Sequence, residues 1–160
     1  MAEMFLKLDG VAGESLDHAH AGEIEILDWS WPTENHVRWD LNQGGQSTKV
    51  EVKSITLHKI CDKASVILYQ NCVTGKHIPS AKITCRKNDG DQKFEYLTLD
   101  LKDIMVSKVE FNGDGNEQSL KETVELSFAE FKLNYRVQRD EGTVGGATSF
   151  GFHVQRQQKI

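Results

Sequence analysis

The sequence has little proline, little cysteine and no long hydrophobic run, and each shortage excludes a class of protein. Only 2 prolines occur among 160 residues, which argues against rigid proline-rich linkers. No apolar run approaches the length of a membrane-spanning segment, so membrane insertion is not expected. The formal net charge is −5, so the chain lacks the basic surface that a general nucleic-acid binder needs, and no nucleic-acid partner is expected.

The three cysteines are odd in number and widely spaced along the chain. Cys61, Cys72 and Cys85 form no Cys-x-x-Cys pair, whereas zinc sites use ligands that lie closer together. We therefore expect buried free thiols in a protein made in a reducing cytosol. Residues 1–9 contain no basic segment followed by a long apolar stretch, so no Sec-type signal peptide is expected.

Motifs of known catalytic centres are also missing. The chain has no Gly-x-Ser-x-Gly elbow, no P-loop and no His-Glu-x-x-His sequence. His18 and His20 would share one side of an extended chain, but no third zinc ligand is suggested nearby. Residues 112–116 lack the glutamate that closes an EF-hand loop and are typical of a hairpin turn. We therefore predict no catalytic residue, no metal and no cofactor.

One segment, residues 61–86, contains a helical period. Side chains suited to one buried helix face recur at Ala64, Ile67, Leu68, Asn71 and Cys72. Asp62 is placed to accept amide hydrogens as an N-cap, and Gly75 is placed to end the helix in a left-handed conformation. Val66, Tyr69 and Val73 lie on other faces, which predicts a helix that is buried on more than one side.

The rest of the chain alternates apolar and polar residues in about eight strands separated by turn residues. The alternation changes parity near Leu27, between Val52 and Ile55, and near Ala129. Strands that change their buried face contain bends or bulges, as curved sheets require. We therefore predict a mainly β fold, an antiparallel β-barrel of two curved sheets with one α-helix and an extended loop, in a single domain of residues 1–160.

Residues 33–48 are polar and show no clear period, and they are therefore predicted to form the extended loop. Long loops without secondary structure are uncommon in compact domains and are often functional. This segment carries Val37 and Trp39, and tryptophan is favoured as a buried anchor at protein interfaces. The loop therefore either folds back on its own domain or packs against a partner.

Several short motifs occur in order along nearly the whole chain. They include residues 4–8 (MFLKL), 13–15 (GES), 72–77 (CVTGKH), 81–87 (AKITCRK) and 124–129 (VELSFA). Taken together, they resemble the haemolysin-coregulated protein (Hcp) family of type VI secretion systems. The resemblance implies a barrel with one helix that forms homohexameric rings.

The same resemblance implies a set of partners and a location. The rings stack into a tube inside a contractile sheath, the tube is capped by a VgrG spike, and secreted effector proteins are carried in or on it. The protein is made in the bacterial cytoplasm and secreted by the type VI system without a cleaved signal peptide. A structural subunit of this kind is not expected to be an enzyme.

The resemblance and the strand pattern together nominate three sites. Ser30 takes the opposite face from Trp29 and Trp31, so it is a candidate contact for cargo in the ring lumen. The helix residues Tyr69 and Val73 are candidates for contact with a neighbouring subunit. The candidate ring-assembly loop comprises Asn35, Val37, Trp39, Asp40 and Leu41.

Two alternative functions follow from the sequence. A monomeric β-barrel carrier would hold a small ligand in an apolar cavity, and a hydrolase would need a catalytic set that the sequence lacks. The assembly protein and the carrier differ in mass, since the first forms rings and the second stays a monomer.

Overall fold

The computed structural model describes residues 2–138 and 144–160 of the chain. Within those residues it contains one helix and eleven strands, so the mainly β class with a single helix is confirmed, with more strands than predicted. The elements are β1 (Ala2–Leu8), β2 (Ile24–Ile26), β3 (Asp28–Ser30), β4 (Thr33–Asp40), β5 (Gly44–Val52), β6 (Ile55–Ile60), α1 (Ala64–Thr74), β7 (His77–Asp89), β8 (Gln92–Asn112), β9 (Lys121–Gln138), β10 (Val144–His153) and β11 (Gln158–Lys159).

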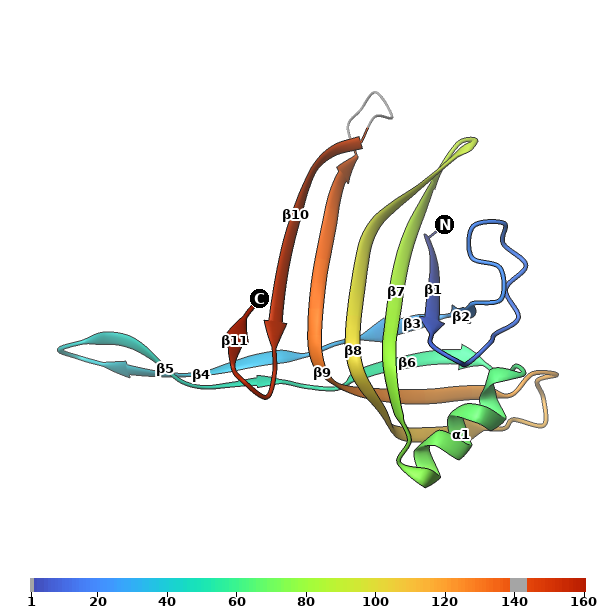
Figure 1. Cartoon of the computed structure of the whole chain (residues 1–160), viewed down its shortest axis with the longest axis horizontal. Helices are drawn as coiled ribbons and strands as arrows, with labels where there is room; N and C mark the ends of the chain where they lie inside the picture. Colours follow the sequence, from blue (N-terminus) through green and yellow to red (C-terminus); the bar gives the residue numbers. More distant parts are fainter. Residues whose placement is uncertain (1, 139–143) are drawn as a thin grey trace.

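Nine strands form one antiparallel sheet that curves around the core. Its hydrogen-bonded order is β11-β10-β9-β8-β7-β1-β2, while β6 pairs with β9 and with β3. The long strands β8 and β9 bend and run through both layers of the fold (Figure 1). Among the strands of the described residues, pairing does not close the sheet into a complete barrel. The chain itself joins β2, which pairs with β1, to β3, which pairs with β6, and Leu27 donates a backbone hydrogen bond to His58 across 2.8 Å at this corner.

The three predicted changes of buried face are confirmed, and each has a structural cause. Leu27 separates β2 from β3, and residues 53–54 separate β5 from β6. Within β9 the inward positions shift between Phe128 and Phe131, where the partner of the strand changes from β6 to β10. A strand that runs through both layers must keep its apolar side chains directed into the core after it bends. A change in the parity of its apolar residues achieves this.

The core lies between the two layers of the curved sheet. Leu57, Leu99 and Leu126 are completely buried there and come from three different strands. Each such side chain contributes about 1.5–3 kcal/mol relative to remaining in water. Leu68 of α1 is equally buried, so the helix covers one end of this core. The body of the protein is therefore held together by its own side chains.

The caps predicted for the two ends of α1 can be compared with the structure. Gly75 has φ 66° and its N–H donates to the carbonyl of Asn71, so the left-handed C-cap is confirmed. The N-cap position is assigned to Lys63, one residue later than predicted, and Lys63 makes no side-chain capping bond. The Asp62 carboxylate still accepts the amide hydrogen of Ala64 at 3.0 Å, from one residue further out. A short polar turn therefore precedes the helix proper.

A buried polar cluster anchors this turn to the sheet. Lys59 and Glu122 are both completely buried, and Lys59 Nζ donates to Glu122 Oε2 across 2.8 Å. Lys59 Nζ also donates to Asp62 Oδ1 at 2.9 Å and to Ser65 Oγ at 3.0 Å. The cluster ties the start of α1 to β6 and β9, since each of its members would be costly to leave unpaired.

The histidine pair considered above as a zinc site has a different environment. His20 is buried, and its two ring nitrogens lie 2.7 Å from Glu23 Oε2 and 2.7 Å from Glu95 Oε1. Its ring stacks on Phe5 with centroids 4.4 Å apart. His20 therefore fastens the N-terminal loop to β1 and β8, and His18 is not part of this arrangement.

Arg86 is the second fastening point of the N-terminal loop. The buried guanidinium of Arg86 donates to Glu3 and to Asp17, and it lies 5.0 Å above the ring of Phe5. Hydrogen bonds from Arg86 and Lys93 hold the pKa of the Asp17 carboxyl well below its usual range. The loop that precedes β2 is thus fixed at two points, by the hydrogen bonds of His20 and by the ion pairs of Arg86.

The prediction of buried thiols was correct for only part of the cysteine set. Cys85 is buried in β7, and burial raises the pKa of its thiol. Cys72 is half-buried on α1, whereas Cys61 is exposed, because the turn before the helix lies at the surface. All three are free cysteines.

Candidate functional site

The segment predicted as an irregular loop is a regular β-hairpin. Strands β4 and β5 pair from Thr33 opposite Val52 to Asp40 opposite Gly44, with a register shift between His36 and Val37. The hairpin projects away from the body of the protein (Figure 1), and every residue of β4 is exposed. The prediction of a loop without secondary structure was wrong, and the alternative in which this segment folds back on its own domain does not occur.

The hairpin has one face with apolar side chains and one charged face. Alternation along β4 places Asn35, Val37 and Trp39 on one side of the ribbon. Val37 is 51% exposed and Trp39 is 79% exposed. The Trp39 ring lies over Gly45 on β5 so closely that a Cβ there would approach it to 2.7 Å. An isolated two-stranded ribbon is marginally stable in water, so an exposed apolar face on one indicates a missing neighbour.

Asp40 and Leu41, the last two residues nominated for the ring-assembly loop, lie at the tip of the hairpin. Asp40 is the last residue of β4 and is exposed. Leu41 follows in the turn, and its side chain is fully exposed to solvent. The five nominated residues therefore belong to one projecting element, although Asp40 lies on the charged face, opposite to Asn35, Val37 and Trp39.

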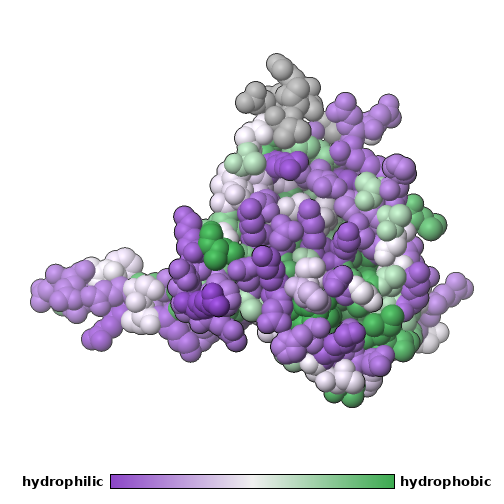
Figure 2. Space-filling model, in the orientation of Figure 1, coloured by the Kyte–Doolittle hydropathy of each residue, from purple (hydrophilic) through white to green (hydrophobic). Residues whose placement is uncertain are grey.

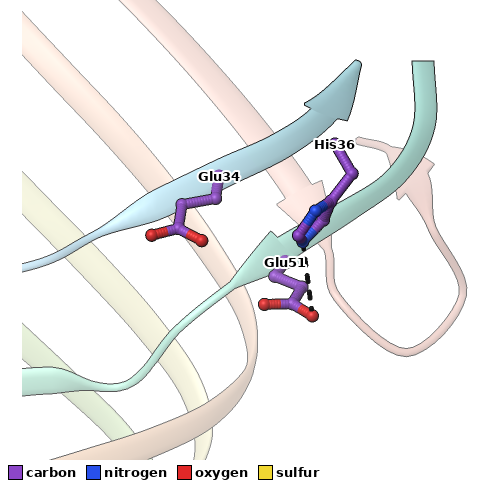
Figure 3. A group of neighbouring side chains, drawn as sticks. All are labelled: Glu34, His36 and Glu51. Carbon is purple, nitrogen blue, oxygen red and sulfur yellow. Dashed lines mark ion pairs between the residues drawn. The ribbon is translucent and has the colours of Figure 1, made fainter. Parts of the chain in front are cut away.

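The charged face holds a cluster that the sequence did not predict. Glu34, His36 and Glu51 place one ligand atom each within 4.8 Å of the others (Figure 3). Lys49 and Lys53 form ion pairs with Glu51 and Glu34 at 3.2 and 3.3 Å. The sequence spacing of these residues carries no metal motif, because Glu51 meets Glu34 only through the pairing of β4 with β5.

Helix α1 carries a second exposed apolar surface. Val66 and Val73 are each 74% exposed, and Tyr69 is 49% exposed. Tyr69 stacks on Phe111 of β8 with ring centroids 5.6 Å apart. Figure 2 shows hydrophobic side chains gathered over the α1 end of the molecule. The prediction that α1 is buried on more than one side was therefore wrong for the single chain, and the residues nominated for subunit contact are accessible.

Ser30 lies where the strand pattern predicted. It is exposed on β3, while Trp29 and Trp31 are partly buried and pack against the core. The Trp31 ring makes an edge-on contact with Phe131, with centroids 4.8 Å apart. The alternation that separates Ser30 from the tryptophans is therefore confirmed, and Ser30 faces away from the core.

Strand pairing adds neighbours to Ser30 that the sequence did not predict. Ser30 lies opposite Thr56 of β6, and Thr56 lies opposite Glu125 of β9. Two residues further along the same strands, Asp28 lies opposite His58, and His58 Nδ1 lies 2.5 Å from Asp28 Oδ1. Ser30 is thus one end of a polar surface across β3, β6 and β9. Only the register of the three strands reveals it.

Two cavities on the body of the protein have linings that combine charged and apolar side chains. A cavity of about 610 Å³ lies between the N-terminal loop, β1, β2 and the turn before α1, and its lining includes Glu3, Glu14 and Glu25. Another of about 500 Å³ includes Arg86 and Lys93 in its lining. Apolar side chains such as Met4, Phe5 and Ile26 also line the first cavity, and Phe94 lines the second, so both walls mix charged and apolar groups. Within the described residues, no helix has the length and apolarity needed to span a membrane.

Comparison with known proteins identifies the family. Residues 5–135 match the family described as "Type VI secretion system effector, Hcp". The chain belongs to the Hcp family. Protein hcp1 of Pseudomonas aeruginosa is 38% identical over 155 residues, which cover 96% of each chain. The family resemblance drawn from the sequence motifs is thereby confirmed.

Solved Hcp structures share the fold. Hcp1 from Salmonella typhimurium superimposes with a TM-score of 0.80 at 34% identity, covering 99% of both chains. A structure described as a type six secretion system protein gives a TM-score of 0.93 at 27% identity over the whole of both chains. The fold described above is thus shared, over nearly its whole length, with solved structures of Hcp proteins of the type VI secretion system.

Proposed function

We propose that this chain is the structural subunit of a type VI secretion inner tube, in which homohexameric rings stack end to end. The observation that carries the proposal is the projecting hairpin, whose apolar face is left exposed by the described residues of its own chain. Membership of the Hcp family supports the same conclusion. The role is structural and not enzymatic.

The hairpin is the principal contact between subunits in this proposal. Val37, Trp39 and Leu41 are all at least half exposed in the single chain. Burying each of them in a neighbour contributes on the order of 1.5–3 kcal/mol. A ring repeats this contact at every subunit, so a modest contribution at one interface is multiplied around the assembly.

The exposed face of α1 is a second contact surface. Tyr69 and Val73 lie on the same side of the helix as Val66, and all three are apolar and exposed. A neighbouring subunit that covers this face would remove the apolar patch from water. The hairpin and the helix lie at opposite ends of the molecule's long axis, which suits contacts with two different neighbours (Figure 1).

The polar surface that includes Ser30 faces the ring channel in this proposal. Effector proteins carried through the tube contact it, while the outside of the tube meets the contractile sheath and its end meets the VgrG spike. The chain is made in the bacterial cytoplasm and leaves by the type VI route without a cleaved signal peptide. The domain of residues 1–160 acts as one unit in each ring.

Sedimentation velocity and negative-stain imaging of the wild-type chain and of Trp39→Glu test the proposal. We expect rings for the wild type and loss of stacking or of rings for Trp39→Glu. Leu16→Glu is the matched control, because Leu16 is 96% exposed and lies outside both surfaces, and it should assemble normally. A wild-type chain that remains monomeric at high concentration would contradict the proposal.

The channel-facing role of Ser30 has its own test. Ser30→Arg should reduce the amount of effector that co-purifies with the rings, without unfolding the body. Ser149→Arg, a change at an exposed serine on β10, should leave co-purification unchanged. Equal effector recovery with both variants would remove Ser30 from the cargo surface.

A further inference from the structure

The charged face of the hairpin brings together three metal-ligating side chains. Glu34 lies directly opposite Glu51 in the β4–β5 ladder. His36 lies two residues further along β4, so its side chain leaves the same face as Glu34. His36 Nε2 lies 3.6 Å from Glu51 Oε1, and the ligand atoms of all three residues lie within 4.8 Å of one another (Figure 3). A single ion between them would reach all three.

A bulge in the hairpin fixes His36 at this position. His36 pairs with Lys49, whereas Val37 pairs with Ser47, so Thr48 is an extra residue in β5. The Thr48 hydroxyl donates to the backbone carbonyl of His36 across 2.7 Å. Bulges redirect the side chains beside them, and this one lies next to the imidazole.

The two lysines beside the cluster select the kind of ion. Lys49 and Lys53 balance the charges of Glu51 and Glu34, so the site offers no excess negative charge. Calcium and magnesium depend on many charged or carbonyl oxygens, and this site provides two carboxylates and an imidazole. An imidazole with two carboxylates suits first-row dications such as Zn²⁺.

The lysines do not block coordination. Lys49 is 69% exposed and Lys53 is 44% exposed, so both side chains can turn into solvent. Their ion pairs involve Glu51 Oε1 and Glu34 Oε1. A bound dication needs only one oxygen from each carboxylate, and it would replace a weak surface ion pair with a coordinate bond.

We propose that Glu34, His36 and Glu51 form a binding site for a first-row transition-metal dication of the Zn²⁺ class. The ion joins the two strands of the hairpin near its base. The neck of the hairpin is adjacent: Lys53 N–H donates to the Pro32 carbonyl at 3.1 Å, and the Trp31 indole donates to the Lys53 carbonyl at 3.1 Å. Metal binding therefore stiffens the projecting element where it leaves the body. This site does not depend on the proposed tube function.

Calorimetric titration of the untagged full chain with Zn²⁺, in a buffer with a non-chelating reductant, tests the proposal. We expect one ion per chain, and a loss of affinity of about tenfold or more for His36→Ala and for the isosteric Glu51→Gln. His77→Ala is the matched control, because His77 is also exposed and paired with a carboxylate, Asp103, at 2.8 Å. It should bind as the wild type does.

A second readout locates the ion. Zn²⁺ should slow amide hydrogen exchange in β4 and β5 of the wild type and should not do so in His36→Ala. Cys61→Ser should retain full binding, since the exposed Cys61 thiol is not a ligand in the proposal. Three results would overturn it: no binding by the wild type, equal affinity for His36→Ala and His77→Ala, or loss of binding in Cys61→Ser.

Discussion

Trp31 and Trp39 are eight residues apart, yet they have opposite environments. Trp31 is partly buried and packs edge-on against Phe131 in the body of the protein. Trp39 is 79% exposed on the hairpin, and its ring lies over Gly45 of the neighbouring strand. A tryptophan that remains in water within a well-formed strand is costly unless another surface covers it. The body thus buries its tryptophan within one chain, whereas the hairpin leaves Trp39 exposed.

Charged side chains differ between the two regions in the same way. The body buries Lys59 and Glu122 completely and links them directly. On the hairpin, Lys49 and Glu51 form an ion pair that is open to solvent. Buried pairs are very sensitive to removal of one partner, whereas exposed pairs contribute little. We therefore expect that removing one partner of the buried pair strongly destabilises the body. Removing one partner of the exposed pair should leave the fold of the hairpin almost unaffected.

The largest effect on stability is expected for Glu122→Ala. It leaves Lys59 buried with one carboxylate, Asp62, at 2.9 Å, and the loss of a buried partner costs about 3–5 kcal/mol of unfolding free energy. Urea unfolding measures this change. Glu110→Ala, at an exposed ion pair with Lys108, is the control and should change stability by less than about 0.5 kcal/mol.

Replacing both buried charges separates the cost of the pair from the cost of an unpaired charge. The double variant Lys59→Met with Glu122→Leu should recover most of the stability lost in Glu122→Ala, because no charge is then left alone. If the single and double variants are equally unstable, the packing volume of these side chains, and not their charge, stabilises the contact of α1 with β6 and β9.

A smaller loss is expected for Gly75→Ala at the end of α1. Gly75 has φ 66°, and an L-residue in the left-handed region costs roughly 1–2 kcal/mol. Gly115→Ala is the control, since Gly115 has no positive φ and open space around its Cα. Thermal unfolding should show a lower midpoint for Gly75→Ala only. Equal midpoints would mean that the helix end adjusts to a side chain.

The ion pair of Asp17 gives the body a dependence on acid. Because Arg86 lowers the pKa of Asp17 in the folded state, this contribution is fully present above the unfolded pKa, about 3.9, and is lost as pH falls below it. Asp17→Asn should therefore be less stable than the wild type at neutral pH, and the difference should shrink below about pH 4. A difference that stays constant down to pH 2 would contradict this origin.

These contrasts also explain how much the sequence could predict. The bends near Leu27 and Ala129 were readable, because alternation reports which face of a strand is buried. The hairpin was not predicted, because Val37 and Trp39 alternate with charged residues over only a few positions and residues 44–48 of the partner strand contain no apolar side chain with which to pair them. Glu51 and Glu34 lie 17 positions apart in the sequence, and only the pairing of β4 with β5 brings them together. The local pattern of apolar residues predicts which side of a strand is buried. Contacts between residues on different strands can be predicted only when the register of strand pairing is known.

The smallest effect on the fold, and the sharpest test of the contrast, is expected for Trp39→Ala. Its side chain touches little of its own chain, so the unfolding free energy should change by less than about 0.5 kcal/mol. Trp31→Ala, the matched control, removes a ring packed on Phe131 and should cost about 2 kcal/mol or more. Assembly should show the reverse order, because the proposed function places Trp39, and not Trp31, against a neighbouring subunit. Urea unfolding and sedimentation velocity of both variants therefore test whether the two tryptophans have different roles. If Trp39→Ala loses stability without losing assembly, the hairpin is part of the fold of the body, and the contrast between Trp31 and Trp39 is wrong.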